Sequence, residues 1–160
     1  MTEIHVRAAS TEDVPLILSF INELAEYERL SDEVVATEDS LREWLFGERP
    51  VAEVVIGEHR GDAAGFALFF HNFSTFLGKP GIYLEDLYVR PEFRRAGMGR
   101  ALLFHLARVA RERGCGRLEW SVLDWNEPAI GFYRGIGASP VSGWTVYRVT
   151  GKALEKLGEH

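Results

Sequence analysis

Residues 83–103 read YLEDLYVRPEFRRAGMGRALL, and three features of this stretch decide the fold around it. The stretch begins as an alternating apolar run that carries two adjacent carboxylates, Glu85 and Asp86. Arginines and glycines then crowd into the following turn, and an apolar pattern with helical spacing runs from Gly97 to Gly114. This order predicts a strand, a glycine-rich turn and a helix.

The turn RRAGMGR at residues 94–100 has the physical properties of an anion site. Gly97 and Gly99 permit close backbone approach, and the first N–H groups of the following helix point at a bound anion. Positive charge is added by Arg94, Arg95 and Arg100. The turn therefore predicts a bound phosphate or pyrophosphate, although many such turns contain glycine for geometric reasons alone. The chain lacks G-x-x-x-x-G-K-[ST], and Leu102 replaces the third glycine of G-x-G-x-x-G, which disfavours P-loop and Rossmann sites.

The composition predicts one soluble globular domain over residues 1–160, with 46% hydrophobic and 26% charged residues. A formal net charge of −6 argues against a nucleic-acid partner and suits a cationic one. Cys115 is the single cysteine, which excludes an internal disulfide. No apolar run has membrane-spanning length and the N-terminus lacks signal character, so we expect a cytosolic protein without a membrane partner.

Apolar periodicity predicts strands and helices that alternate along the chain. Strands are predicted over residues 3–8, 51–59, 63–72, 81–89, 116–123 and 144–150. Helices are predicted over residues 10–30, 37–47, 97–114 and, as a short helix stopped by Gly137, within 124–138. The interleaving indicates an α/β or α+β domain with a mixed sheet.

Two motifs resemble the signatures of the GNAT acetyltransferases. Arg94, Gly97 and Gly99 satisfy the pattern [R/Q]-x-x-G-x-G/A, and DWNEPAIGFYRGIGA at residues 124–138 resembles the second signature of the family. Nearly the whole chain is similar to the diamine (spermidine/spermine) acetyltransferase branch and its thialysine-acetylating relatives. The segments that carry this closer similarity are ELAEYERLSDEV, YLEDLYV, VLDWNEPAIGFY and the Gly-Trp at residues 143–144.

The resemblance implies the GNAT acyl-CoA N-acyltransferase fold, with a mixed, mostly antiparallel sheet that is splayed at the cofactor site and flanked by helices. It also implies acetyl-CoA as cosubstrate. Residues 87–89 would pair with the pantetheine arm, residues 95–100 would wrap the pyrophosphate, and residues 126–129 would flank the arm. The implied cofactor-binding residues are Leu87, Tyr88, Val89, Arg94, Arg95, Ala96, Gly97, Met98, Gly99, Arg100, Asn126, Pro128, Ala129 and Tyr133.

Acetyl transfer to an amine raises two proton problems. An alkylamine has a pKa of about 10, so it must lose a proton before it attacks, and the departing thiolate leaves more easily when an acid protonates it. The resemblance gives the acid role to Tyr133, whose alternative is a core tyrosine beside Phe132. Neighbours on a strand point to opposite faces, so only one of Glu85 and Asp86 enters the cleft. The resemblance makes Glu85 the base, with Asp86 as second choice, and solvated acids on an edge strand are the alternative.

The resemblance also implies an amine site with acidic and aromatic side chains, which suit an alkylammonium ion. The implied substrate-binding residues are Tyr27, Glu28, Glu85, Asp86, Glu119, Trp120 and Ser121. Glu119 and Trp120 differ in type from those expected in a polyamine-specific enzyme. The segment SPVSGW is shorter than its counterpart in the diamine enzymes, and Ser142 stands where an acid would hold a distal ammonium. The amine is thus a diamine, a lysine analogue or another small aminoalkyl compound.

The first hypothesis is therefore an acetyl-CoA-dependent N-acetyltransferase of small polycationic or lysine-like amines. The alternatives are acetylation of a protein amine or an unrelated small amine, and a non-catalytic acyl-CoA sensor. Five histidines show no ligand spacing, so we expect no metal, and Cys115 has no histidine partner in sequence, which favours direct transfer. The resemblance further implies a homodimer, and the apolar strand predicted at residues 144–150 fits a need for a partner edge.

Overall fold

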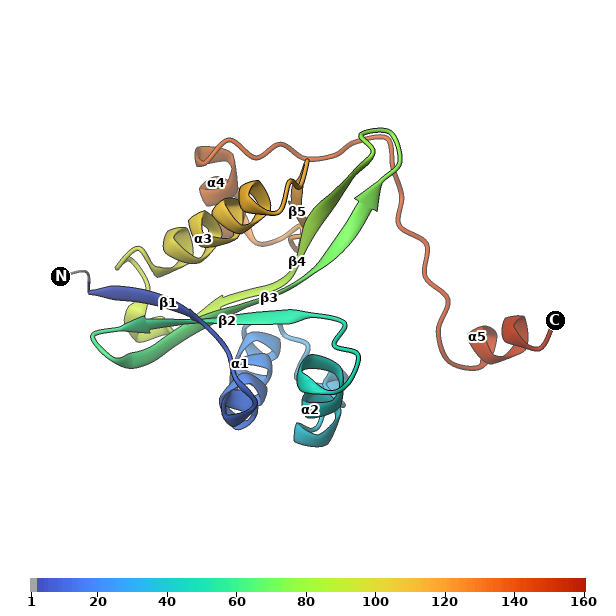
Figure 1. Cartoon of the computed structure of the whole chain (residues 1–160), viewed down its shortest axis with the longest axis horizontal. Helices are drawn as coiled ribbons and strands as arrows, with labels where there is room; N and C mark the ends of the chain where they lie inside the picture. The colour runs from blue at the N-terminus through green and yellow to red at the C-terminus, as the bar shows by residue number, and fades with distance from the viewer. Residues whose placement is uncertain (1–2) are drawn as a thin grey trace. The chain divides into compact units, whose positions relative to one another are not determined.

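The computed structural model describes residues 3–160, which divide into two compact parts (Figure 1). The first part runs to Leu123 and holds the sheet with three of the helices. The second part, Asp124–His160, holds two short helices. That the chain forms one domain over residues 1–160 stays a prediction.

The first part is built on a five-stranded sheet in the order β1-β2-β3-β4-β5. The strands are β1 (Ile4–Ala8), β2 (Glu53–His59), β3 (Asp62–Ser74), β4 (Lys79–Val89) and β5 (Leu118–Trp120). Strands β1 to β4 pair antiparallel with their neighbours, and β5 pairs parallel with β4. The predicted mixed, mostly antiparallel sheet is confirmed, although β5 is shorter than the predicted 116–123.

Helices cover both faces of this sheet (Figure 1). The helices α1 (Val14–Tyr27) and α2 (Glu38–Phe46) pack on one face, and α3 (Met98–Glu112) packs on the other. Under α1 the rings of Phe20 and Phe66 stack with their centroids 5.2 Å apart. On the α3 face, Gly57 leaves room for the Met98 sulfur, where any Cβ would collide with it. Each fully buried aromatic or aliphatic side chain of these layers stabilises the fold by about 1.5–3 kcal/mol.

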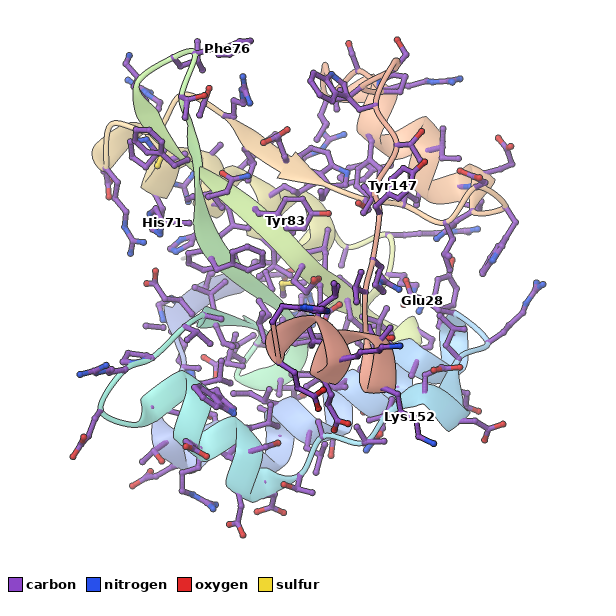
Figure 2. The ribbon with its side chains drawn as sticks, turned by 90° about the vertical axis from the view of Figure 1, so that its right-hand side faces the viewer. Glu28, His71, Phe76, Tyr83, Tyr147 and Lys152 are labelled. Carbon is purple, nitrogen blue, oxygen red and sulfur yellow. The ribbon has the colours of Figure 1, made fainter. Side chains whose placement is uncertain are left out.

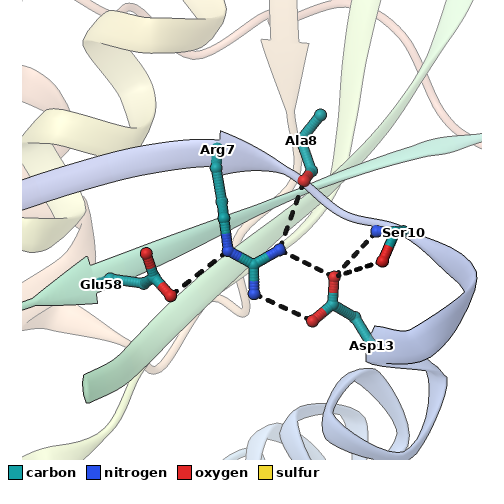
Figure 3. Close-up of polar contacts among 5 residues, drawn as sticks. All are labelled: Arg7, Ala8, Ser10, Asp13 and Glu58. Atoms are coloured by element: carbon teal, nitrogen blue, oxygen red, sulfur yellow. Dashed lines mark hydrogen bonds and ion pairs between the residues drawn. The ribbon is translucent and has the colours of Figure 1, made fainter. Parts of the chain in front are cut away.

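The junction between β1 and α1 is fixed by the guanidinium of Arg7 (Figure 3). It donates to both carboxylate oxygens of Asp13, at 2.8 and 2.9 Å, and to Glu58 on β2 at 3.3 Å. Asp13 also accepts the backbone N–H of Ser10 at 2.8 Å. The hydrogen bonds from Arg7 hold the pKa of Asp13 below its usual value. The start of α1 is thereby attached to the sheet.

The second part contains α4 (Glu127–Gly135) and α5 (Gly151–Gly158), with no regular structure between them. The predicted strand at 144–150 is therefore wrong. A strand needs hydrogen bonds from a neighbour, and no strand described in residues 3–160 pairs with this segment. Its apolar side chains are exposed, as in Trp144, Val146 and Tyr147. Helix α5 was not predicted from the sequence. No helix described in the structure is both long enough and apolar enough to span a membrane.

Candidate functional site

A β-bulge in β4 decides where the two adjacent carboxylates point. Asp86 pairs with Leu68 and Leu84 pairs with Phe69, so Glu85 has no partner on β3. Without the bulge, residues 84 and 86 would lie on the same face. With it, Leu84 is buried on the α3 face, whereas Asp86 lies on the α1 face together with Tyr88. Glu85 is exposed and Asp86 is half-buried.

Asp86 lies close enough to Glu28, at the end of α1, for the Glu28 charge to affect its pKa. Burial, together with the smaller effects of the charges of Glu85 and Glu28, raises the pKa of Asp86 to about 6. Burial also raises the pKa of Glu28. Figure 2 shows Glu28 at the end of its helix. The two predicted substrate residues Glu28 and Asp86 thus form one acidic cluster in which the pKa of both carboxyl groups is raised.

The end of α1 has an unusual backbone that fixes Glu28. The helix closes with Leu30 N–H donating to Ala25 C=O at 2.7 Å and Arg29 N–H donating to Glu26 C=O at 3.1 Å. Arg29 takes the left-handed conformation, with φ of 63°, in a position where glycine is usual. A residue with a Cβ pays about 1–2 kcal/mol there. Helix α1 therefore ends at Tyr27, before the predicted end at residue 30.

A polar network joins α1 to the end of β4. Glu23 accepts from Arg90 Nε and Nη2, both at 3.0 Å, and the Tyr88 hydroxyl donates to the same carboxylate at 3.2 Å. The Arg90 guanidinium also lies over the Phe20 ring, 4.6 Å from its centroid. Burial, and then the Glu23 charge, raise the pKa of Tyr88. This network holds α1 against the end of β4 and was not predicted from the sequence.

The turn after β4 has the predicted form of an anion site. Arg95 and Gly97 both have left-handed backbones, with φ of 71° and 89°. The first backbone bond of α3 runs from Ala101 N–H to Gly97 C=O, so the N–H groups of Met98, Gly99 and Arg100 precede it. These N–H groups have no partner within the helix and suit an anion. The Cβ of any residue but glycine would strain position 97.

The edge of β4 is open where the pantetheine arm is expected. Strand β5 pairs with β4 only at residues 82–84, whereas β3 pairs with β4 as far as Val89. In the sheet described here, the β4 edge at residues 85–89 therefore has no strand on the β5 side. Backbone groups of residues 87–89 on this side are available to an extended ligand, apart from the Val89 carbonyl, which accepts from Arg94 Nε at 3.0 Å.

The predicted substrate residues on and after β5 are held by neighbours. Glu119 accepts from Asn72 Nδ2 at 3.2 Å, and Ser121 Oγ lies 2.6 Å from the hydroxyl of Tyr83. Figure 2 shows Tyr83 on β4. Trp120 is half-buried. Asn72 and Tyr83 were not singled out from the sequence, because their contacts depend on strand register.

The second part of the chain carries the remaining predicted residues. Asn126 is buried, with 7% of its surface exposed, and its side-chain oxygen caps α4 by accepting from Ala129 N–H at 3.4 Å. Pro128 is in the first turn, where its missing N–H costs nothing. Tyr133 is half-buried on α4, and its ring centroid lies 5.7 Å from that of Phe132.

No group of three or more His, Cys, Asp or Glu side chains within residues 3–160 is arranged to hold a metal ion. The first part of the chain brings Tyr27, Glu28, Asp86 and the arginine-glycine turn to one end of β4. It combines a half-buried acidic cluster with a turn whose N–H groups suit an anion, at the same strand end. This arrangement can attract a cationic amine and hold a phosphate-bearing acyl donor.

Comparisons with known proteins agree with this arrangement. The sequence model of the Acetyltransferase (GNAT) family matches residues 17–138. A thialysine N-epsilon-acetyltransferase from Bos taurus is 40% identical, over 98% of this chain and 98% of that protein. A human spermidine/spermine N(1)-acetyltransferase-like protein 1 is 30% identical, over 96% of this chain and 24% of that protein. The structure of an integron cassette protein from V. cholerae has a TM-score of 0.83 at 28% identity and covers 100% of both chains.

Proposed function

The chain belongs to the GNAT acetyltransferase family and is an N-acetyltransferase, and we propose that it acetylates a primary amine of a small lysine-like or polycationic molecule with acetyl-CoA. The observation that carries the proposal is the acidic cluster of Asp86 and Glu28 at the open end of β4. An alkylammonium ion is attracted to such a cluster because its positive charge offsets the repulsion between two nearby carboxylates.

The alkylammonium loses two protons in the reaction, and the thiolate gains one. A carboxylate of β4 takes the first proton, and the neutral amine nitrogen then attacks the carbonyl carbon of the acetyl group, so that an N–C bond forms and the C–S bond breaks. Tyr133 donates its hydroxyl proton to the departing thiolate, and the tyrosinate recovers a proton from the second one that the nitrogen loses as the amide forms. The support for Tyr133 is its place in the second family signature, residues 124–138, most of which forms α4.

Two carboxylates compete for the role of base. The sequence favours Glu85 over Asp86, and that order stays a prediction. The burial of the two side chains favours the reverse, because Asp86 is half-buried with a pKa of about 6 and Glu85 is exposed at the bulge. A base is most effective when its pKa lies near the working pH. We therefore propose Asp86 as base, with Glu85 as the competing assignment.

The acetyl-CoA-binding residues of this proposal are those implied by the two family signatures and by the open edge of β4. The N–H groups at residues 98–100, with Arg95 and Arg100, bind the pyrophosphate, and the open β4 edge at residues 87–89 pairs with the pantetheine arm. Asn126, Pro128 and Ala129 flank the arm, as in the family signature. The left-handed Gly97 supports this assignment, because it turns the chain so that α3 starts at the anion site.

The class of amine is proposed from two features. Thialysine acetylation is the activity named for the relative at 40% identity, and Ser142 provides no acid for a distal ammonium. Both favour a substrate with one reactive amine and an amino-acid head over a long polyamine. Tyr27, Glu28, Glu119, Trp120 and Ser121 are the side chains proposed to contact it.

A thiol-release assay tests the proposed function. The protein is incubated with acetyl-CoA and a panel of thialysine, ornithine, lysine, putrescine and spermidine, beside the Tyr133→Phe variant. We expect turnover on the amino acids with the terminal amine, and a loss of about 10²-fold in kcat for Tyr133→Phe. Binding of acetyl-CoA without turnover on any amine would contradict the proposal, and turnover on peptides alone would point to a protein-modifying enzyme.

We also propose that the protein is a homodimer in the cytosol. The exposed Trp144, Val146 and Tyr147 support a dimer, since an apolar segment of this kind is stabilised by pairing with another chain. Size-exclusion chromatography with light scattering tests it. A monomeric mass at micromolar concentration would contradict the dimer, and cell fractionation tests the location.

A further inference from the structure

Arg94 is the first residue of the R-x-x-G-x-G motif, and its side chain makes contacts other than the one that the motif predicts. The motif predicts a phosphate ligand. In the structure Arg94 Nε donates to the backbone carbonyl of Val89 at 3.0 Å, which turns the side chain back over the end of β4. The hydrogen bond spans the short 3-10 turn Pro91–Phe93, so the arginine closes that turn.

The guanidinium of Arg94 lies over two aromatic rings, one at the end of α1 and one on β4. Its central carbon lies 5.0 Å from the centroid of Tyr27 and 5.9 Å from that of Tyr88. Tyr27 is the last residue of α1, directly before Glu28. Tyr88 belongs to β4 and donates to Glu23 of α1. One cation thus joins the end of the amine-side helix to the cofactor-side strand.

This geometry has a consequence for the ring of Tyr27. The side chain is 38% exposed, so packing covers only part of it. An arginine over a ring face supplies a directional attraction and covers that face. The contact with Arg94 therefore restrains the orientation of this ring, one residue before Glu28.

We propose that Arg94, anchored on the Val89 carbonyl, is a positioning residue of the amine site that orients the Tyr27 ring, and that the pyrophosphate is bound by the residues after it. The inference rests on the proposed function. It divides the motif into two roles: Arg94 orients the amine wall, and residues 95–100 hold the anion. The amine and acetyl-CoA are therefore bound by neighbouring parts of one short turn.

Steady-state kinetics with thialysine and acetyl-CoA separate the two roles. Arg94→Ala is expected to raise KM for thialysine about tenfold, equal to about 1.4 kcal/mol, with KM for acetyl-CoA changed less than about twofold. Arg94→Lys keeps a cation and should restore part of the loss. The matched control is Arg100→Ala, which should raise KM for acetyl-CoA instead. Equal rises in both KM values for Arg94→Ala would overturn the inference.

A double-mutant cycle tests whether Arg94 acts through Tyr27. If it does, Arg94→Ala should have less than about a twofold further effect on KM for thialysine in a Tyr27→Leu background. Additive effects would refute the positioning role. Neither outcome depends on how the acetyl-CoA site behaves.

A spectroscopic measurement distinguishes failure of this inference from failure of the proposed function. In protein labelled with 3-fluorotyrosine, the ¹⁹F signal of Tyr27 is assigned through Tyr27→Phe. It should shift in Arg94→Ala and stay in place in Arg100→Ala. An unmoved signal in Arg94→Ala would overturn the contact even in a protein that acetylates no amine, whereas a shifted signal without turnover would contradict only the proposed reaction.

Discussion

Glu28 at the end of α1 raises the pKa of Asp86 on β4, although the two residues come from different layers of the fold. Burial is the larger cause of the raised value, and the charges of Glu85 and Glu28 add to it. Because its pKa is raised in the folded protein, Asp86 is favoured there in its protonated form, and its ionisation destabilises the fold. It regains stability when an ammonium ion takes the proton's place, which links acid titration to amine binding.

The pH dependence of turnover follows from this cluster. Asp86 is charged above its pKa of about 6, so kcat/KM for thialysine should rise with pH and level off above about pH 6–7. Below the pKa it should fall about tenfold per pH unit. Asp86→Asn should remove this limb and lower kcat/KM by about 10²-fold, whereas Glu85→Gln should keep it. A pH profile that loses its acid limb in Glu85→Gln alone would instead make Glu85 the base.

The same pKa predicts that Asp86 destabilises the protein at alkaline pH. Between pH 3.8, where an unfolded aspartate titrates, and about pH 6, the folded state binds more protons than the unfolded state, so stability falls as pH rises. The full shift corresponds to about 3 kcal/mol, and solvent access to the half-buried side chain reduces it to about 1–2 kcal/mol. Asp86→Asn should therefore be more stable than wild type in urea at about pH 8.

The control for this stability effect is the same comparison of Asp86→Asn with wild type at low pH. At about pH 3 Asp86 is protonated in both states, and the gain of Asp86→Asn should vanish. Glu85→Gln should give a smaller gain at about pH 8, since burial is the first cause of the raised pKa and remains in that variant. A gain that is equal at both pH values would show that packing, not charge, is responsible.

The fold was largely predictable, because apolar spacing specifies which residues face a core. The turn at residues 94–100 was predictable too, since Gly97 signals a left-handed start to a helix. The face of Asp86 was not, because it depends on the bulge at Glu85, and a bulge depends on how many residues β3 places opposite. The Glu23–Arg90 pair joins residues that are remote in sequence, so no local sequence pattern predicts it. The segment at 144–150 has the spacing of a strand, but spacing supplies no hydrogen-bonding neighbour.

The strained backbone of Arg95 predicts opposite effects on stability and on cofactor binding. Its φ of 71° favours glycine, so Arg95→Gly should stabilise the protein by about 1 kcal/mol. The loss of a cation at the proposed pyrophosphate site should raise KM for acetyl-CoA about three- to tenfold. Arg95→Ala is the matched control, because it removes the same cation and keeps the strain. It should raise KM equally without the gain in urea unfolding, and a stabilised Arg95→Ala would argue against backbone strain.

The Glu23–Arg90 pair should matter for the site in a way that a similar surface pair does not. Both Glu23–Arg90 and Glu53–Arg113 are two-pronged ion pairs, with N–O distances of 3.0 Å for both contacts of the first and 2.7 and 2.9 Å for the second. Glu23 also accepts the Tyr88 hydroxyl, so its loss leaves a buried tyrosine and a half-buried arginine without this carboxylate as acceptor. Glu23→Ala should cost about 1–2 kcal/mol in urea unfolding.

The kinetic effects of these two pairs should differ more than their effects on stability. Glu23→Ala frees the end of α1 from β4, so it should raise KM for thialysine, because Tyr27 and Glu28 follow on the same helix. Glu53→Ala should cost less than about 1 kcal/mol and leave both KM values unchanged, since its pair joins β2 to the end of α3 on the exposed surface. Equal kinetic losses in the two variants would mean that the pair on α1 has no special link to the amine site. An effect confined to Glu23→Ala would tie the position of α1 to amine recognition.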